Sequence, residues 1–303
     1  MRSKDRKVDY SLKLCREVLG LPAFHFGYFE RETRIDTNQT RMNANNLRQL
    51  ALDSREFAFS KLTIEDLKNA QLKYTEKLLS YIPSEVKTIL DVGCGTGISC
   101  EILISKGYNV ECLSPDLYNQ KVINEKFKSA VKFHLTKFEE FSVEKKHDII
   151  LMSESSQYIS LKKLFEKCNG LLNKDGYLLI SDYFRKEATG YYRNCAVLSR
   201  FLDEAEKNGF KILKSEDITE NVLPTLSIGE QYYKKFVIPI TEALISLAYD
   251  EIPKTTKVIK FLFRRKIKKI AEDIHRKNPE KLNPEKFRQN LRYMIYLFQK
   301  ERE

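Results

Sequence analysis

The sequence lacks any long apolar run. No segment of its 303 residues approaches the roughly 18 consecutive apolar residues that a bilayer-spanning helix requires. Its first residues, MRSKDRKVDYSLKLCREV, are charged where a secretory signal carries its apolar region. Both absences predict a soluble protein of the cytoplasm.

Paired cysteines and metal-ligand spacings are missing as well. The six cysteines include no C-x-x-C pair, and none is spaced like a metal ligand relative to the four histidines. We therefore expect no metal site, no disulfide framework and six free thiols. These thiols belong to Cys15, Cys94, Cys100, Cys112, Cys168 and Cys195.

Apolar residues and positive charge are abundant. Hydrophobic residues make up 42% of the chain, with 18 Phe and 16 Tyr, so a folded core is expected. The length suits one large domain, alone or with an attached lobe. The 53 basic and 42 acidic residues give a net charge of +11. This charge favours an anionic partner such as nucleic acid, a membrane or an acidic substrate.

Short apolar strands alternate with amphipathic helices between residues 63 and 217, after a helix that begins at Thr63. We expect strands at 88–92, 109–113, 131–135, 147–152, 177–182 and 210–216, and helices at 97–105, 117–126, 161–172 and 196–208. This alternation is typical of a doubly wound α/β fold whose parallel sheet carries helices on both faces. A seventh strand at 290–300 follows a mainly helical stretch, which predicts an insertion before the last strand of a mostly parallel sheet.

A glycine-rich loop follows the first of these strands. In Asp91-Val-Gly-Cys-Gly-Thr-Gly97, glycine occupies every second position and a helix comes next. Glycine lets the backbone turn tightly and approach a ligand, and the helix start offers free N–H groups. The nicotinamide fingerprint G-x-G-x-x-G is not met, because Ile98 stands where its third glycine belongs. The acidic Asp91, two residues before the first glycine, indicates another cofactor.

These residues resemble the first motif of the class I S-adenosylmethionine-dependent methyltransferases, which reads much like LDVGCGTG. The segments 148–158 and 171–182 resemble the fourth strand and the fifth-strand region of the same family. The resemblance implies a Rossmann-like methyltransferase fold and S-adenosylmethionine as cofactor. It also divides the chain into an N-terminal cap (1–62), a cofactor-binding core (63–217), a helical basic lid (218–289) and the final strand (290–303).

The resemblance implies cofactor-binding residues one by one. Gly93, Gly95 and Gly97 would form the floor under the methionine part, and Asp91 would hold its amino group. The acid expected near the ribose falls on Ser114 or Cys112, depending on the alignment, with Asp116 just beyond, and the acid expected near the adenine falls on Lys137. The other candidates of the cofactor site are Tyr28, Cys94, Thr96, Phe138, as a stacking residue, and Ser153.

Three short segments resemble small-molecule methyltransferases that act on sterols, tocopherols and related compounds: residues 24–29, 153–159 and 217–225. This branch implies a hydrophobic small-molecule acceptor, lipid-, polyene- or quinone-like, methylated by direct displacement in a water-excluded pocket. A base or a carboxylate facing the acceptor would assist, and the catalytic candidates are Glu154, His25 and Asp182. Each of the three has a purely structural role as its alternative.

Most of the net charge lies in one segment. Residues 254–281 contain 11 basic and 3 acidic residues and thus contribute +8. Ile267, Ile270 and Ile274 continue an apolar stripe that predicts a basic amphipathic helix. Its stripe either packs on the core or lies on an anionic membrane surface, which would place the protein at the inner membrane face. Nucleic acid is less favoured, because no nucleic-acid module is recognisable. A nucleic-acid methyltransferase and a non-catalytic binding module remain the alternative functions.

Overall fold

The computed structural model describes residues 8–30, 62–188, 192–252 and 264–301. The chain divides into two compact units. The first comprises Met1–Glu30, Ile64–Val222 and Asn290–Glu303, and the second includes Leu223–Gln289. Of the predicted basic segment, residues 254–263 lie outside the described residues. Within the described ranges, no helix is both long enough and apolar enough to span a bilayer.

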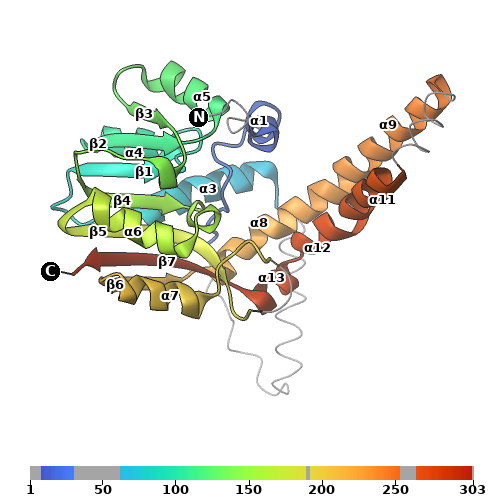
Figure 1. The fold of residues 1–303 in the computed structure, drawn as a ribbon. Helices are drawn as coiled ribbons and strands as arrows, with labels where there is room; N and C mark the ends of the chain where they lie inside the picture. The colour runs from blue at the N-terminus through green and yellow to red at the C-terminus, as the bar shows by residue number, and fades with distance from the viewer. Residues whose placement is uncertain (1–7, 31–61, 189–191, 253–263, 302–303) are drawn as a thin grey trace, which may run out of the picture. The chain divides into compact units, whose positions relative to one another are not determined.

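A seven-stranded sheet forms the centre of the first unit (Figure 1). Its strands are β1 (Thr88–Val92), β2 (Asn109–Ser114), β3 (Lys132–Leu135), β4 (His147–Ser153), β5 (Leu172–Arg185), β6 (Phe210–Asp217) and β7 (Leu291–Lys300). Their order is β3-β2-β1-β4-β5-β7-β6. Only β7 runs antiparallel, between β5 and β6. The predicted seven-stranded, mostly parallel α/β fold is thus confirmed.

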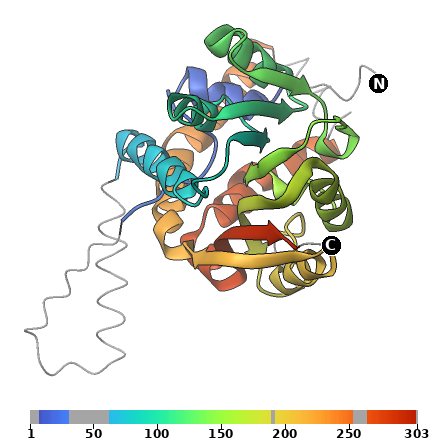
Figure 2. The same ribbon diagram turned by 90° about the vertical axis from the view of Figure 1, so that its left-hand side faces the viewer.

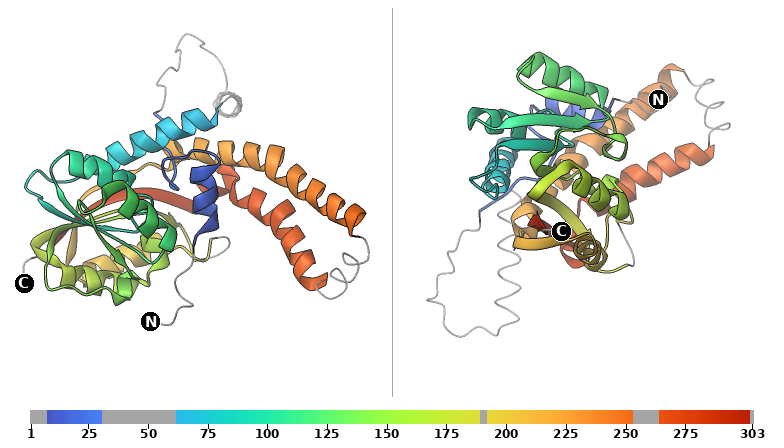
Figure 3. Two further views of the ribbon diagram at one scale, coloured as in Figure 1. Left: turned by 90° about the horizontal axis from the view of Figure 1, so that it is seen from above. Right: turned by 60° about the vertical axis from the view of Figure 1, so that its left-hand side comes forward.

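Helices cover both faces of this sheet, as Figures 2 and 3 show from two further directions. The first unit contains α1 (Tyr10–Glu17), α3 (Ile64–Leu79), α4 (Ile98–Ser105), α5 (Leu117–Phe127), α6 (Leu161–Leu171), α7 (Leu198–Lys207) and the single turns η2 (Phe138–Glu140) and η3 (Ser156–Tyr158). Helices α3 and α4 pack against each other on one face, and α6 and α7 do so on the other.

The central strands are apolar throughout because helices cover them on both sides. In β4, Ile149, Ile150, Leu151 and Met152 are all fully buried. Burying one such side chain is worth about 1.5–3 kcal/mol, so these strands supply much of the free energy that holds the loops after them in place.

The strand β5 is longer than the prediction of 177–182. It begins at Leu172, which was expected to end the preceding helix, and extends to Arg185. Leu172 pairs with His147, and the register then shifts before Tyr177 pairs with Ile149. The remainder pairs with β7 up to Arg185. These strand partners come from distant parts of the chain, so the polar local sequence around Asn173 does not indicate the extension.

The second unit is helical. It contains most of α8 (Thr219–Tyr232), then η4 (Tyr233–Val237), α9 (Ile238–Glu251), α11 (Arg264–Glu272), η5 (Asp273–Lys277), α12 (Asn278–Lys281) and most of α13 (Pro284–Asn290). One arm of this unit is formed by α8, η4 and α9, and the other by α11, η5 and α12. The two arms lie side by side in both views of Figure 3. The Asn278 Nδ2 donates a hydrogen bond to Tyr233 Oη over 3.2 Å, and Gly229 faces Leu282.

Candidate functional site

The glycine loop joins β1 to α4 with three glycines in left-handed conformations, at φ values of 80° for Gly93, 53° for Gly95 and 84° for Gly97. A Cβ on Gly93 would lie 2.4 Å from Ser155 Cβ, and one on Gly97 would lie 2.4 Å from Ile123 Cδ1. A Cβ on Gly95 would meet nothing within 4 Å. Gly93 and Gly97 therefore allow Ser155 and Ile123 to pack closely against the loop, whereas Gly95 leaves open space beside it.

Asp91 lies in β1 just before this loop, and only 2% of its surface is exposed. Its Oδ2 lies 3.5 Å from the Cys100 sulfur, which is the only polar group within hydrogen-bond distance of it in the described part of the chain. Burial raises the pKa of this carboxyl to about 7. Burying an ionised carboxylate with so few polar partners costs free energy, so the position favours binding of a cation.

Cys100 and Cys112 correct the expectation of six separate thiols. Their sulfur atoms are in contact beside Asp91, although their Cα atoms lie 7.6 Å apart, farther than the 4.4–6.8 Å usual for a disulfide. The other four cysteines are free, as predicted. Asp91, Cys100 and Cys112 are together the one cluster of potential metal ligands that the described residues form. The prediction of no metal site stays a prediction.

The ribose candidates stand at the end of β2. Ser114 Oγ accepts hydrogen bonds from the Asp116 N–H over 3.2 Å and from Asn119 Nδ2 over 3.1 Å. Asp116 caps α5, since its Oδ1 accepts from the Asn119 N–H over 2.9 Å, and its Oδ2 accepts from the Asp9 N–H over 2.7 Å. Both carboxylate oxygens of Asp116 are therefore engaged within the protein, and its contact with a ribose stays a prediction.

The remaining cofactor candidates divide between the loop and more distant positions. Thr96 Oγ1 donates to Pro22 O over 3.3 Å and ties the loop to the N-terminal segment, while Cys94 packs beside it. Lys137 precedes η2, and Phe138 is only 3% exposed within the core. The Tyr28 ring lies 5.8 Å from Lys77 Nζ on α3. The binding roles of these residues stay predictions.

Glu154 stands at the end of β4 in a left-handed conformation, at φ 51°, and joins a network of buried hydroxyls. Its Oε1 accepts hydrogen bonds from Tyr293 Oη over 2.6 Å and from the Phe26 N–H over 2.8 Å. Tyr293 Oη also lies 3.0 Å from Tyr74 Oη, which donates to Ser181 Oγ over 2.7 Å. The other oxygen of Glu154 has no protein partner among the described residues.

The surroundings of Glu154 favour its neutral form. Burial raises the pKa of the carboxyl to about 8 and the nearby Asp182 charge adds to this, while the bonds from Tyr293 and Phe26 oppose it. A carboxyl with a pKa near the working pH and one unengaged oxygen is suited to take up a proton.

His25 lies against Tyr74, with ring centroids 4.4 Å apart. Burial lowers the pKa of the imidazole to about 4, so the ring is neutral at pH 7. Its Nδ1 must donate to Phe26 O, at 2.8 Å, because a carbonyl only accepts. Nε2 lies 3.2 Å from Thr75 Oγ1, but this hydroxyl donates its single proton to Gln71 O over 3.0 Å. A catalytic role of His25 stays a prediction.

Asp182 on β5 is fully buried and holds the turn that follows β4. Its Oδ2 accepts from Ser156 Oγ over 2.6 Å and from the Gln157 N–H over 3.1 Å, and its Oδ1 accepts from the Tyr183 N–H over 2.9 Å. Burial nevertheless raises its pKa to about 6. The structure thus brings Asp182 close to Glu154, where it holds the η3 turn, and a catalytic role of Asp182 stays a prediction.

Tyr74 and Tyr293 were missed in the sequence. Tyr74 lies on the buried face of α3, and Tyr293 lies in the predicted last strand. The one available signal was that each places a hydroxyl in an otherwise apolar stretch, where a buried hydroxyl needs a partner. Ser153, by contrast, was named, and its Oγ lies 3.1 Å from Tyr74 Oη.

Residues 64–214 match the family model described as a methyltransferase domain. Over 137 residues the chain is 30% identical to malonyl-[acyl-carrier protein] O-methyltransferase 2 of Ilyobacter polytropus. This match covers 43% of the chain and 53% of the relative, so the chain spans about half the length of that protein.

Solved structures share the fold over nearly the whole chain. Geranyl diphosphate C-methyltransferase from Streptomyces coelicolor A3(2), in complex with S-adenosyl-L-homocysteine, has a TM-score of 0.62 at 14% identity, covering 96% of this chain and 92% of its own. The [4+2]-cyclase SpnF has a TM-score of 0.61 at 16% identity, covering 97% and 94%. At these identities the likeness shows the fold alone. The family match over residues 64–214 shows a methyltransferase domain in this chain, and the shared fold is that of the class I S-adenosylmethionine-dependent methyltransferases.

Proposed function

We propose that this chain transfers the methyl group of S-adenosylmethionine to a small-molecule acceptor with an apolar part. The observation that carries the proposal is Asp91, a buried carboxylate beneath the glycine loop with no cation near it among the described residues. The open space beside Gly95 gives a ligand access to the loop.

These residues fit the cofactor. S-adenosylmethionine carries an ammonium group and supplies a methyl group on a sulfonium centre. Asp91 offers the negative charge that an ammonium group requires, in a site where water competes little. Gly95 offers a backbone that can be approached closely, and α4 begins at Ile98 without a side-chain cap. The loop residues Gly93, Gly95 and Gly97, with Asp91, are those we assign to the cofactor.

The acceptor side of the site is assigned to Glu154 and the rings around it. The Phe26 ring lies 5.4 Å from Tyr293 and 6.0 Å from Tyr183. Such rings exclude water and favour an apolar group. We infer that the unengaged oxygen of Glu154 takes the proton of an acceptor hydroxyl, while Tyr293 and Phe26 hold the carboxyl in position.

The pair Gly95→Ala and Gly107→Ala tests the cofactor site. Both glycines have positive φ, 53° and 86°, and a Cβ on either would meet nothing within 4 Å. Both variants therefore carry a comparable backbone strain, of about 1–2 kcal/mol. Only at Gly95 does the methyl group enter the space assigned to the cofactor. We expect calorimetry to show S-adenosylmethionine binding at least tenfold weaker in Gly95→Ala and unchanged in Gly107→Ala. Undetectable binding to the wild type at millimolar cofactor, or equal binding by both variants, would contradict the proposal.

We further infer that the second unit contacts an anionic membrane surface. Three side chains of α9 are more than half exposed: Ile240 at 55%, Leu244 at 60% and Leu247 at 55%. In α11, Ile267 and Ile270 are exposed among arginines and lysines, and the described helix buries none of its residues. Apolar side chains flanked by basic ones suit the headgroup region of an anionic bilayer.

Vesicle flotation tests this inference. Replacing Arg264, Lys268 and Lys269 with Gln removes three positive charges from α11. Because each basic residue near such a surface contributes about 1 kcal/mol, we expect the variant to bind vesicles with one quarter phosphatidylglycerol at least tenfold more weakly. The control replaces Lys162, Lys207 and Lys211 of the first unit with Gln and should float like the wild type. Equal flotation of both variants, or none by the wild type, would refute the membrane contact.

A further inference from the structure

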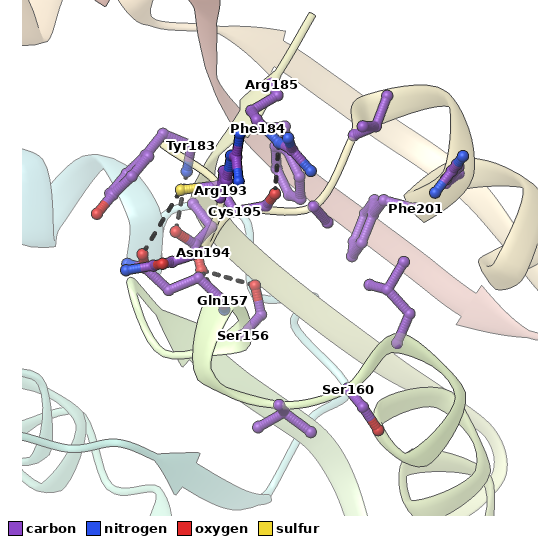
Figure 4. Close-up of a pocket in the computed structure, with 16 residues that line it drawn as sticks. Ser156, Gln157, Ser160, Tyr183, Phe184, Arg185, Arg193, Asn194, Cys195 and Phe201 are labelled. Atoms are coloured by element: carbon purple, nitrogen blue, oxygen red, sulfur yellow. Dashed lines mark hydrogen bonds between the residues drawn. The ribbon is translucent and has the colours of Figure 1, made fainter. Parts of the chain in front are cut away.

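A cavity of about 250 Å³ opens where β4 and β5 end. It lies entirely within the first unit, between η3, the starts of α6 and α7, and the segment 193–197 (Figure 4). Gln157 lines it and donates from Nε2 to the backbone oxygen of Glu154 over 3.4 Å. Tyr183, another lining residue, contacts the Phe26 ring. The cavity is therefore next to the acceptor side of the site.

Two arginines of this cavity have no anionic partner among the residues that the structure describes. Arg193 and Arg200 both line it, both are exposed, and neither has a hydrogen bond or ion pair with any described residue. Arg185 differs, because its Nε donates to Cys195 O over 2.8 Å and its Nη1 to Ala188 O over 3.3 Å. Arg185 thus fixes the segment that carries Arg193, while Arg193 and Arg200 keep their donors available.

Two helices also begin at this cavity without a side-chain cap. Ser160 precedes α6 and Val197 precedes α7, and neither side chain caps its helix. Valine is a poor N-cap, so the first N–H groups of α7 have no side-chain acceptor. Both helices exceed eight residues, and their N-termini add partial positive charge to that of the two arginines. The labelled Ser160 and Phe201 mark these helices in Figure 4.

The Asp182 carboxylate at the cavity already has hydrogen-bond donors within the protein. Asp182 lines it, but its two carboxylate oxygens accept hydrogen bonds from Ser156, Gln157 and Tyr183. The size of the cavity also limits the ligand. At about 30 Å³ for each water, it has room for about eight waters, which suits an anionic head group rather than a complete long-chain molecule.

We propose that Arg193, Arg200 and the starts of α6 and α7 bind an oxyanion of the acceptor, a carboxylate or a phosphate, and so orient the acceptor toward Glu154. The inference rests on the proposed methyl transfer and names the class of its substrate: a small acid or phosphate ester with an apolar part. The fork-shaped guanidinium groups suit either oxyanion, because each can be bound through two parallel hydrogen bonds.

Calorimetry with three anions at constant ionic strength tests this subsite. The probes are inorganic phosphate, inorganic diphosphate and succinate, titrated into the wild type, into Arg193→Gln/Arg200→Gln and into Lys207→Gln/Lys211→Gln. The last variant makes the same change in net charge with lysines that do not line the cavity. We expect at least one probe to bind the wild type and the control alike, and to bind the arginine variant at least tenfold more weakly.

The outcomes distinguish a phosphate ester from a carboxylic acid as acceptor, and they test the oxyanion subsite separately from the proposed function. Tighter binding of the phosphates assigns a phosphate ester as acceptor, and tighter binding of succinate assigns a carboxylic acid. If no probe binds the wild type, or if both double variants lose binding equally, the oxyanion subsite is refuted. S-adenosylmethionine is titrated into the same samples. If it binds while the anions do not, only the subsite fails, and if it does not bind, the proposed function fails.

Discussion

Asp91→Asn should make the protein more stable at pH 8 while weakening S-adenosylmethionine binding about a hundredfold. The carboxyl of Asp91 has its pKa raised from 3.8 to about 7 by burial. Its ionised form therefore costs the folded state up to about 4 kcal/mol, at 1.36 kcal/mol per pKa unit. Asparagine keeps the shape and removes the charge, so this cost disappears, together with the attraction for an ammonium group.

The stability gained by Asp91→Asn should depend on pH. Between pH 3.8 and about 7 the folded protein holds a proton on Asp91 that the unfolded chain has released, so wild-type stability falls as pH rises through this window. The gain from Asp91→Asn should be largest above pH 7 and vanish toward pH 4. Urea denaturation without cofactor measures it. Equal urea midpoints of variant and wild type at pH 8 would show that Asp91 is not an uncompensated charge.

Asp182→Asn is the matched control for this variant. Asp182 is also fully buried, but its two oxygens accept three hydrogen bonds. An asparagine there would turn an NH₂ group toward at least one of these donors, so we expect a loss of stability at pH 8 instead of a gain.

Glu154→Gln should lower the rate of methyl transfer to a hydroxyl acceptor by a factor of about 10² to 10⁴, the usual contribution of a general base. Glutamine can still accept the bonds from Tyr293 and Phe26 through its oxygen, so the fold and cofactor binding should stay intact. The measurement is the transfer of labelled methyl from S-adenosylmethionine to small molecules of a cell extract. A variant as active as the wild type would exclude Glu154 as the base.

The pH profile separates a proton-transfer role of Glu154 from a structural one. Because its pKa is raised to about 8, the ionised fraction grows through this range, and activity should rise with pH to a plateau. We expect a midpoint no higher than about 8, since a cationic cofactor beside the carboxyl lowers its pKa. Tyr293→Phe removes a hydrogen bond that favours the ionised form, so its midpoint should lie at higher pH than that of the wild type.

The fold could be predicted from the sequence where local pattern and burial agree. The strand 88–92 and the loop after it were expected with the observed bounds, because buried parallel strands are apolar throughout and the glycines mark the turn. The extension of β5 to Leu172 and Arg185 could not be predicted, since the hydrogen bonds that support it come from His147 and from β7. Strand length depends on partners that are distant in the sequence.

Some residues of the site could be predicted from the sequence, but the residues that they contact could not. Asp91 and Glu154 could be named because each stands at a strand end next to a recognisable segment. The Tyr293 hydroxyl that positions Glu154 arrives from a strand 139 residues away in sequence. Arg193 and Arg200 carry no motif, and only the cavity shows that their charges have no partner among the described residues.

The position of β7 between β5 and β6 has a consequence for biosynthesis. Among the described strands β6 pairs only with β7, and β7 is translated after all of Leu223–Gln289. At about 5–20 residues per second, a nascent chain carries β6 unpaired for several seconds. Glu154 also lacks its tyrosine during this time, so the acceptor site is completed only after β7 has been translated.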